Sequence, residues 1–233
     1  MKLIVTRPSE DSAILAHKLM AMDHEVVSSP LLEIVANSNI KIPDEPWVAV
    51  LVTSANGVRC LPANSVPSNV RVIAVGAQSA QAARDWGFQH VESHGGDVTQ
   101  LANWIVVNLS PTSSPLLYLT GKEISGDLAG ILSGHGFNVR RVETYGAEAR
   151  PLKLSQKEIK VCDGVLLYSP RSARLWVNAL NSGELIGAAA HLRHYCLSSA
   201  VAQILPQDWL KSVASEPTES ALLQLLEPAV KGE

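Results

Sequence analysis

Short apolar runs alternate along this chain with stretches in which apolar residues recur at helical spacing. The runs LIVT (3–6), VAVLVT (48–53) and GVLLYS (164–169) each stop at a threonine or serine. The segment after the first run places Ile14, Leu15, Lys18, Leu19 and Met22 on one helical face. Strands this apolar, separated by helices, indicate parallel sheets that are covered on both faces. The pattern therefore predicts an α/β protein with doubly wound sheets.

The same reading places each expected element in the chain. Strands are expected over 3–6, 25–29, 48–53, 70–76, 90–93, 116–120, 138–143, 164–169, 194–198 and 212–215. Helices are expected from Ser9 as N-cap, from Asn56, over 77–86, 97–107, 125–133, 173–180 and 200–205, and after residue 215. The Pro-rich, polar segments 30–46 and 143–156 are typical of connectors.

An internal repeat is more informative than the alternation. LIVTRPSEDSAIL resembles LYLTGKEISGDLAGIL, VAVLVTSANGV resembles DGVLLYSPRSA, and HVESHGGDVTQL resembles KSVASEPTESALL. Because these matches occur in the same order, the chain reads as A–B–A′–B′, which gives two copies of a five-stranded unit.

Composition narrows the class of protein. The chain has 233 residues, 46% of them hydrophobic and 18% charged, with a formal net charge of −3, so it offers no long-range attraction for nucleic acid or anionic membranes. The start MKLIVTRPSED meets charge and proline too early for a signal peptide, and no apolar run is long enough to span a bilayer. Three cysteines in apolar surroundings indicate reduced thiols. We therefore expect a cytoplasmic protein, a monomer, without membrane or nucleic-acid partners.

Small polar residues follow the expected strands just before the helices. They are Thr6–Arg7, Thr53–Ser54, Gly76, Thr120–Gly121, Ser169–Pro170–Arg171 and Ser198. Ligands of open α/β sheets bind outside the carboxyl ends of the strands, and helix N-termini favour anions. Serine and threonine at such positions also serve simply as helix caps. Six such ends in two related halves favour a large ligand with several negative charges.

Other kinds of site fit the sequence poorly. Ser54 and Ser169 lack both a Gly-x-Ser-x-Gly elbow and a histidine nearby in the sequence, which argues against a serine nucleophile. A Gly-rich phosphate loop and a GxGxxG motif are both missing. The histidines of HVESH (90–94) and HLRH (191–194) do not follow the HExxH arrangement, because the first pair is expected at a strand end. We therefore expect no metal site.

Taken together in their order, the motifs resemble the uroporphyrinogen-III synthase family over nearly the whole chain. They are TRP before a helix, VTSANGV, AVG, LYLTG, VETYGA, LLYSPRSA, CLSSAVA and the EPTESALL tail. The resemblance implies two flavodoxin-like parallel-sheet domains joined by a two-stranded β-ladder. Domain 1 would comprise 1–34 plus 151–233, domain 2 would comprise 44–143, and 35–43 with 144–150 would form the ladder.

The resemblance also implies a reaction. Members of this family close hydroxymethylbilane, a linear tetrapyrrole with eight carboxylates, into uroporphyrinogen III; the last pyrrole ring is inverted, water is lost, and no cofactor takes part. Carried over, the tyrosine that assists departure of the hydroxyl is Tyr145. The substrate-binding positions, which would act mostly through backbone N–H groups, are Thr6, Arg7, Ser54, Asn56, Gly76, Thr120, Gly121, Ser169, Arg171, Ser172 and Ser198.

A hypothesis from another class stays open at this point. A cytosolic two-domain protein that binds an anionic metabolite without chemistry would carry the same strand ends. Another α/β lyase is a further alternative. The sequence does not separate these readings, because the implied reaction needs few special side chains.

Overall fold

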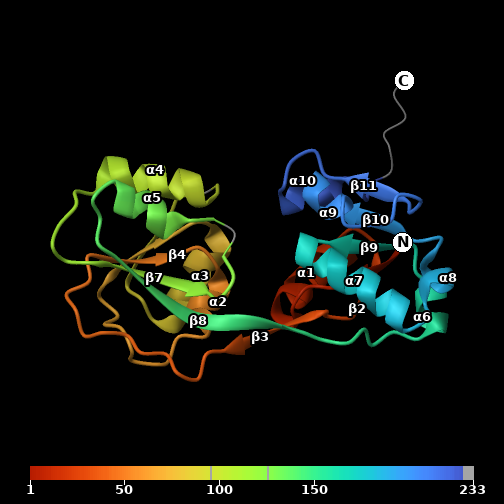
Figure 1. Ribbon diagram of the computed structural model, residues 1–233, viewed down its shortest axis with the longest axis horizontal. Helices are drawn as coiled ribbons and strands as arrows, with labels where there is room; N and C mark the ends of the chain where they lie inside the picture. The colour runs from red at the N-terminus through yellow and green to blue at the C-terminus, as the bar shows by residue number, and fades with distance from the viewer. Residues whose placement is uncertain (95, 125, 228–233) are drawn as a thin grey trace. The chain divides into compact units, whose positions relative to one another are not determined.

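The computed structural model describes residues 1–94, 96–124 and 126–227, and it divides into two compact units. The first unit is Met1–Glu33 with Glu148–Glu233, and the second is Ile34–Ala147 (Figure 1). The chain therefore leaves the first unit, builds the second without interruption, and returns to complete the first.

The first unit is built on a five-stranded parallel sheet with the order β11-β10-β9-β1-β2. Ile4 pairs with Val165 and Val5 with Leu166, so the first strand of the chain lies beside a strand from its last third, as the resemblance implied. The strands are β1 (Lys2–Val5), β2 (Glu25–Ser28), β9 (Gly164–Leu167), β10 (Arg193–Cys196) and β11 (Lys211–Val213).

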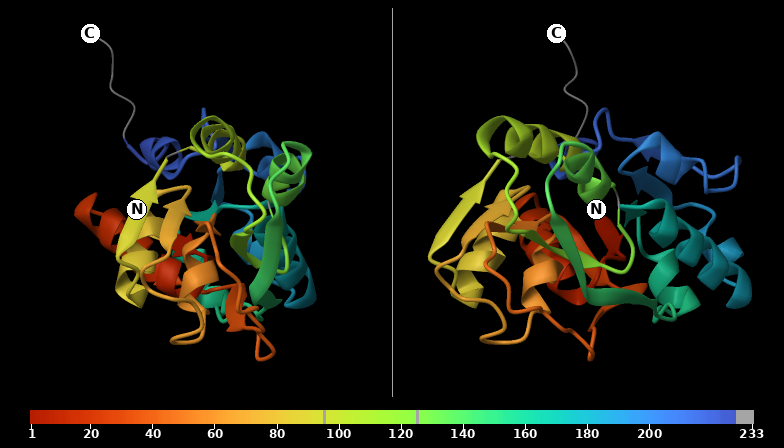
Figure 2. Two further views of the ribbon diagram at one scale, coloured as in Figure 1. Left: turned by 90° about the vertical axis from the view of Figure 1, so that its left-hand side faces the viewer. Right: turned by 60° about the vertical axis from the view of Figure 1, so that its left-hand side comes forward.

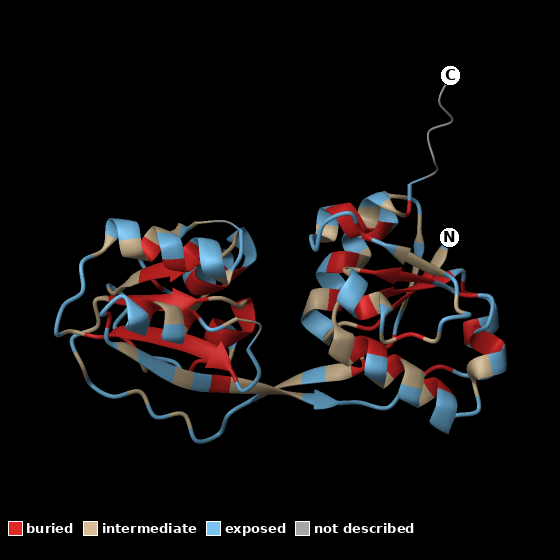
Figure 3. Ribbon diagram, turned by 45° about the horizontal axis from the view of Figure 1, so that its top comes forward, coloured by how far each residue is buried: buried red, intermediate tan, exposed pale blue. Residues whose placement is uncertain are grey.

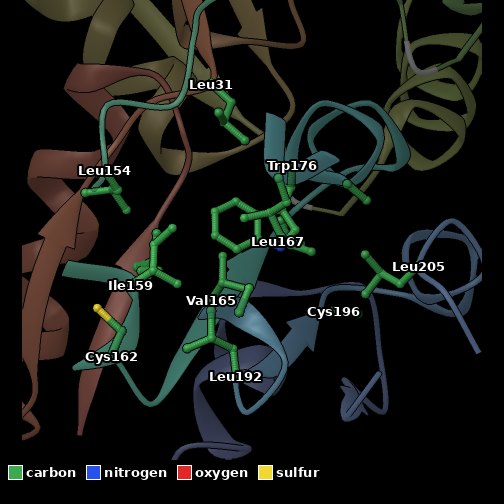
Figure 4. Packing of buried hydrophobic residues seen from close by; sticks show 14 of the residues in the cluster. Leu31, Leu154, Ile159, Cys162, Val165, Leu167, Trp176, Leu192, Cys196 and Leu205 are labelled. Atoms are coloured by element: carbon green, nitrogen blue, oxygen red, sulfur yellow. The ribbon is translucent and has the colours of Figure 1, made fainter. Parts of the chain in front are cut away.

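Helices pack on both faces of this sheet. On one face, Val165 and Leu167 of β9 lie against Trp176 of α7, whose side chain is fully buried (Figure 4). On the other face, Leu166 packs with Leu15 and Leu19 of α1. The helices are α1 (Ser9–Ala21), α6 (Gln156–Lys160), α7 (Pro170–Ser182), α8 (Ile186–Ala189), α9 (Ser199–Ala202) and α10 (Glu219–Gln224).

The second unit holds a six-stranded sheet with the order β3-β8-β7-β4-β5-β6. From β8 to β6 all neighbours are parallel, and all four residues of β4 are buried. The strands are β3 (Leu32–Ala36), β4 (Ala49–Val52), β5 (Arg71–Ala74), β6 (His90–Ser93), β7 (Leu116–Gly121) and β8 (Val139–Ala149).

Its helices also divide between the two faces (Figure 2). Val50 and Val52 pack toward α2 and α3, whereas Ala49 and Leu51 pack toward α4 and α5, because successive side chains of a strand point to opposite faces. The helices are α2 (Ala55–Arg59), α3 (Ala77–Trp86), α4 (Val98–Asn108) and α5 (Leu128–Gly134).

Two chain segments cross between the units, and they pair with each other. The N–H of Arg150 donates to Leu31 at 2.9 Å and that of Asn37 donates to Thr144 at 2.9 Å, so β3 and the end of β8 run in opposite directions. Figure 3 shows this ribbon as mostly intermediate or exposed, in contrast to the buried central strands.

The resemblance implied that 35–43 would supply one strand of the ladder. The strand in this connector is β3, Leu32–Ala36, which begins earlier and is shorter. The side chain of Asn37 accepts a hydrogen bond from the N–H of Asn39 and turns the chain just after β3. Pro43 and Pro46, which have no N–H to donate, follow in the irregular stretch before β4.

The two sheets have the same arrangement in space, although the chain passes through them in different orders. Listed as β2-β1-β9-β10-β11, the first sheet has the flavodoxin order 2-1-3-4-5. The run β8-β7-β4-β5-β6 repeats it, with A′ supplying the first two strands and B the other three. The predicted α/β class with two flavodoxin-like parallel sheets and the internal repeat are therefore confirmed.

Some local expectations were wrong. Ser9 is the first residue of α1 and not its cap; Pro8 holds the cap position, and no side chain caps the helix there. The short helices α6 and α8 were not expected. Helix α5 begins at Leu128 with Asp127 as its cap, and Ser125, where that helix was expected to start, lies outside the described residues.

Candidate functional site

Six of the twelve candidate residues lie at the carboxyl edge of the second sheet. Because β4, β5 and β7 are parallel, the turns that follow them open at one edge. The switch point of this sheet lies between β7 and β4, whose following helices cover opposite faces, and it is where open α/β sheets form their ligand crevice. The six residues are Ser54, Asn56, Gly76, Thr120, Gly121 and Tyr145.

Ser54 and Asn56 form the turn that follows β4. Ser54 is the N-cap of α2, and its hydroxyl accepts a hydrogen bond from the N–H of Asn56 at 3.3 Å. The carboxamide oxygen of Asn56 accepts from Arg59 at 3.2 Å, and Asn56 is only 9% exposed. The structure thus gives both side chains a role in shaping the turn.

Gly76 and Thr120 contribute to the same edge in different ways. Gly76 is the N-cap of α3, and a Cβ added to it would meet nothing within 4 Å, so neither packing nor backbone conformation demands a glycine there. Thr120 is buried, and its hydroxyl donates to the carbonyl of Gly121 at 3.1 Å. Its side chain is therefore part of the end of β7.

Tyr145 lies on β8 directly beside the end of β7. It pairs with Gly121 across a register shift, and its carbonyl accepts the N–H of Lys122 at 2.8 Å. The residue is half-buried, and its ring lies over the α-carbon of Gly121. A phenol thus lies at the end of β7, one of the two strands that flank the switch point of this unit.

The other six candidate residues lie at the corresponding edge of the first sheet. They are Thr6, Arg7, Ser169, Arg171, Ser172 and Ser198. The switch point here is between β1 and β9, and the buried hydroxyl of Thr6 closes it by donating to the carbonyl of Leu166 at 3.1 Å.

Two serines close the N-terminus of α7. The hydroxyl of Ser169 accepts the N–H of Ser172 at 3.1 Å, and the hydroxyl of Ser172 meets the N–H of Ser169 at the same distance, which is a reciprocal capping box. Ser198 caps the shorter α9 without a side-chain hydrogen bond. The side chain of Ser169 therefore caps its helix, as the sequence allowed, whereas the side chain of Ser198 makes no capping hydrogen bond.

Arg7 is held by carboxylates of its own unit. Its guanidinium donates to Asp11 and to Glu219, each at 2.9 Å, and lies 4.5 Å from the ring centroid of Tyr168. Lys18 forms a second ion pair with Glu219. Burial, and then the charge of Glu219, raise the pKa of Tyr168 above the usual phenol range, so its hydroxyl remains a donor and reaches Glu219 at 3.3 Å.

Sequence reasoning missed several residues that shape these edges. The Arg7 cluster also contains Asp11, Tyr168 and Glu219. Near Tyr145, Thr144 donates to the carbonyl of Gly57, and Arg141 donates to the carbonyl of Gly121. The sequence held no usable signal for Thr144, because the alternation of side chains along a strand is interrupted at the register shift where it lies. The Glu219 contact had no signal either, because 212 positions separate the partners.

The histidines of the two pairs contact protein groups. His94 meets Glu92 at 2.9 Å and stacks on Trp104, and the hydrogen bond from Arg71 holds the pKa of Glu92 below its usual range. His191 lies 2.9 Å from the carbonyl of Cys162. Within residues 1–94, 96–124 and 126–227, no group of three or more potential metal ligands comes together.

A hollow of about 900 Å³ lies elsewhere in the second unit. Trp47, Leu61, Trp86 and the segment 63–68 line it, so it opens at the amino ends of the strands. None of the candidate residues contributes to it. The switch-point edge therefore stays the candidate site, since ligands of such sheets bind at the carboxyl ends.

The fold and these edges define a class of protein: an α/β protein of two flavodoxin-like units, each with small polar residues at its switch point. The family model described as "Uroporphyrinogen-III synthase HemD" matches residues 14–224. The chain belongs to the uroporphyrinogen-III synthase family, whose members are cyclising lyases of tetrapyrrole biosynthesis.

A solved structure agrees with the fold. The crystal structure of uroporphyrinogen-III synthetase from Helicobacter pylori is 18% identical, with a TM-score of 0.64 over 97% of this chain and 98% of that one. A mutant uroporphyrinogen III synthase from the extremely thermophilic bacterium Thermus thermophilus is 13% identical, with a TM-score of 0.48 over 97% and 96%. The fold assignment rests on the first. No match was found among curated protein sequences. In the described chain, every helix is too short or too polar to cross a bilayer.

Proposed function

We propose that this chain closes hydroxymethylbilane into uroporphyrinogen III and that Tyr145 assists the loss of water. Membership of the family supports the reaction. The observation that carries the proposal for Tyr145 is its place: its ring lies over Gly121, the last residue of β7, which is one of the two strands that flank the switch point of the second unit. Ligands of open α/β sheets bind at this edge.

The reaction needs a hydrogen-bond or proton donor at the leaving oxygen of the substrate. The C–O bond at the terminal carbon of the substrate breaks, the pyrrole nitrogen supplies electrons, and the leaving oxygen takes up a proton and departs as water. A phenol is ordinarily protonated at neutral pH and can donate a hydrogen bond or a proton to that oxygen. A carboxylate there would repel a substrate that carries eight negative charges.

The carboxyl edges of the two units would hold the substrate carboxylates. We assign this mainly to the backbone N–H groups of Thr6, Ser54, Asn56, Gly76, Gly121, Ser169, Arg171, Ser172 and Ser198. Thr120 belongs to the same binding positions, and the side chains of Arg7 and Arg171 would add charge-assisted bonds. The hydroxyls of Ser54, Ser169, Thr6 and Thr120 already bond within the protein, so a substrate carboxylate would compete with those bonds. The N–H groups of Asn56, Ser169 and Ser172 donate to capping hydroxyls, and a carboxylate bound there would replace those hydroxyls as the acceptor. For Arg7 to add a charge-assisted bond, a substrate carboxylate must compete with Asp11 and Glu219.

The remaining expectations belong to the same proposal. The two units would be the domains of the enzyme, 1–34 plus 151–233 and 44–143, with 35–43 and 144–150 as linker. The enzyme would work as a cytoplasmic monomer that binds neither nucleic acid nor membranes, and it would need no cofactor.

One assay separates this proposal from a protein that only binds an anionic metabolite. Hydroxymethylbilane generated in place by an enzyme is supplied to the purified protein, and the type I and type III isomers are separated. The proposal predicts type III in excess, whereas the substrate alone closes to type I. Type I alone, in the presence of folded protein, would refute the proposal.

A further inference from the structure

The ring of Tyr145 occupies the space that a side chain at position 121 would need. A Cβ built on Gly121 would lie 2.7 Å from Cζ of Tyr145 and 3.0 Å from both Cε2 and the hydroxyl oxygen. The backbone of Gly121 does not have the positive φ that favours glycine. A side chain at this position would therefore have to displace the phenol, whereas the path of the chain would accept one.

A β-bulge brings the two residues together. Along β7 and β8 the register pairs Thr120 with Glu143, and the next pair is Gly121 with Tyr145, so one residue of β8 is skipped. The skipped residue is Thr144. Bulges next to active sites re-aim side chains, and this one sets the tyrosine beside the last residue of β7.

Thr144 anchors the bulge through its hydroxyl. Its side chain is fully buried, and its hydroxyl donates to the carbonyl of Gly57 at 2.8 Å, with the carbonyl of Thr120 at 3.4 Å. Gly57 belongs to α2, the helix whose first turn carries Ser54 and Asn56. Thr144 thus ties the strand of Tyr145 to the turn that follows β4.

Arg141 holds the end of β7 as well. Its guanidinium donates to the carbonyls of Gly121 at 3.2 Å and Lys122 at 3.1 Å, and the N–H of Lys122 bonds to the carbonyl of Tyr145. Hydrogen bonds from Thr144, Arg141 and Lys122 therefore hold the backbone on which Tyr145 lies.

From this geometry we infer that Gly121 and Thr144 are positioning residues for the phenol of Tyr145: Gly121 by leaving room for the ring, and Thr144 by locking the bulge that aims it. The inference rests on the proposed catalytic role of Tyr145 and adds how that hydroxyl is placed. It also gives Gly121 a task beyond its backbone N–H.

The first test compares Gly121→Ala with Gly146→Ala. A methyl group at 121 must displace the ring by about 1 Å, and a misplacement of that size can cost about 100-fold in rate. A Cβ at 146, the neighbour of Tyr145 in the same strand, meets nothing within 4 Å. We expect kcat for type III product to fall about 100-fold in Gly121→Ala, with KM changed less than threefold, and to stay within twofold in Gly146→Ala. Equal rates in the two variants would overturn the inference.

The second test asks whether Gly121 and Thr144 act through the phenol. In a Tyr145→Phe background the hydroxyl is already absent, so adding Gly121→Ala or Thr144→Val should lower kcat by less than threefold. Thr144→Val alone should lower kcat about tenfold, and Thr144→Ser, which keeps the hydroxyl, should restore most of it. Full multiplication of the single effects in the double variants would contradict the inference.

A structural readout keeps the inference independent of the proposed role of Tyr145. Crystal structures of Gly121→Ala and Gly146→Ala should show the phenol displaced in the first and unmoved in the second. If Tyr145→Phe has wild-type activity, the catalytic role fails, and the position of the ring still decides whether Gly121 seats it. A phenol that stays in place in Gly121→Ala overturns the inference.

If Gly121→Ala folds poorly, denaturation curves test whether position 121 and the ring of Tyr145 collide. The added methyl group collides with the ring, so Gly121→Ala should lower the denaturant midpoint of the wild-type protein. The same change should shift it much less in a Tyr145→Ala background, where the ring is gone. An equal shift in both backgrounds would show that the collision is with something other than the tyrosine.

Discussion

The guanidinium of Arg7 donates to the carboxylate of Glu219 at 2.9 Å, and so joins the turn after the first strand to the first residue of the last described helix. Both side chains are about three-quarters buried, and Asp11 and Lys18 extend the pair to two cations and two anions. The cluster is locally neutral, although the substrate proposed to bind at this edge is strongly anionic. Arg7 therefore serves the fold of the first unit whatever it contributes to binding.

Arg7→Gln should destabilise the protein. Breaking partly buried ion pairs costs more than the median of up to about 1 kcal/mol for exposed ones, and we expect a loss of about 1–2 kcal/mol in the free energy of unfolding. Arg174→Gln, on the exposed side of α7, is the matched control and should change that free energy by less than about 0.5 kcal/mol. Chemical denaturation measures both, and equal effects would show that the cluster adds no stability.

Replacing the strand-end serines should affect stability more than turnover. Ser54→Ala and Ser169→Ala each remove a helix cap and should cost about 1 kcal/mol, while the backbone donors stay in place. Turnover should stay within about tenfold of wild type. Complete loss of activity in either folded variant would instead point to a serine nucleophile.

Stability should fall in acid because of His194. Its Nε2 accepts the indole N–H of Trp176 at 3.1 Å, so the proton sits on Nδ1, which lies 3.2 Å from the carbonyl of Leu210. Burial lowers the pKa of His194 to about 4. Well above pH 6.5 the ring is neutral in both the folded and unfolded states, and the contribution of this group to stability is fully present.

As the pH falls from about 6.5 toward 4, His194 binds a proton in the unfolded chain but stays neutral in the folded chain. The free energy of unfolding should drop by up to about 3 kcal/mol from this group. Denaturation curves at pH 7 and pH 4.5 measure it, with His194→Gln as the comparison. The same acid sensitivity in His194→Gln would show that another group is responsible.

Two of the three thiols should resist alkylation in the folded protein. Burial raises the pKa of Cys196 to about 11 and raises that of Cys162, so little thiolate exists at pH 8. A thiol reagent should therefore label these two only after denaturant is added, whereas Cys60 is half-buried. Rapid labelling of Cys196 in the native protein would contradict its placement in the core.

The sequence predicted the strands well because the central ones are buried on both faces. The runs that contain Val50 and Val165 are apolar throughout, short and β-branched, as is typical of strands in parallel sheets covered on both faces. The pairing of Ile4 with Val165 was different, because periodicity carries no information about which strands become neighbours. That pairing came from the resemblance of the whole chain to a family.

Details that depend on contacts between distant residues were out of reach. Ser9 looked like a cap, but Pro8 took the position. The serines at 54 and 169 were recognised because a polar residue between a strand and a helix has few other roles. The bulge that sets Tyr145 over Gly121 could not be predicted from the sequence of β7 or of β8 alone, because it depends on how the two strands pair.

The most direct test of the account is the single-turnover rate of folded Tyr145→Phe on freshly generated hydroxymethylbilane, with the isomers separated. General acid assistance contributes about 10²–10⁴-fold, and the pyrrole nitrogens already supply part of the driving force. We predict normal folding, unchanged binding of product, and formation of type III slowed by about 100-fold, with type I accumulating from the uncatalysed reaction. Wild-type formation of type III by Tyr145→Phe would contradict the account, because the hydroxyl would then take no part in the departure of water.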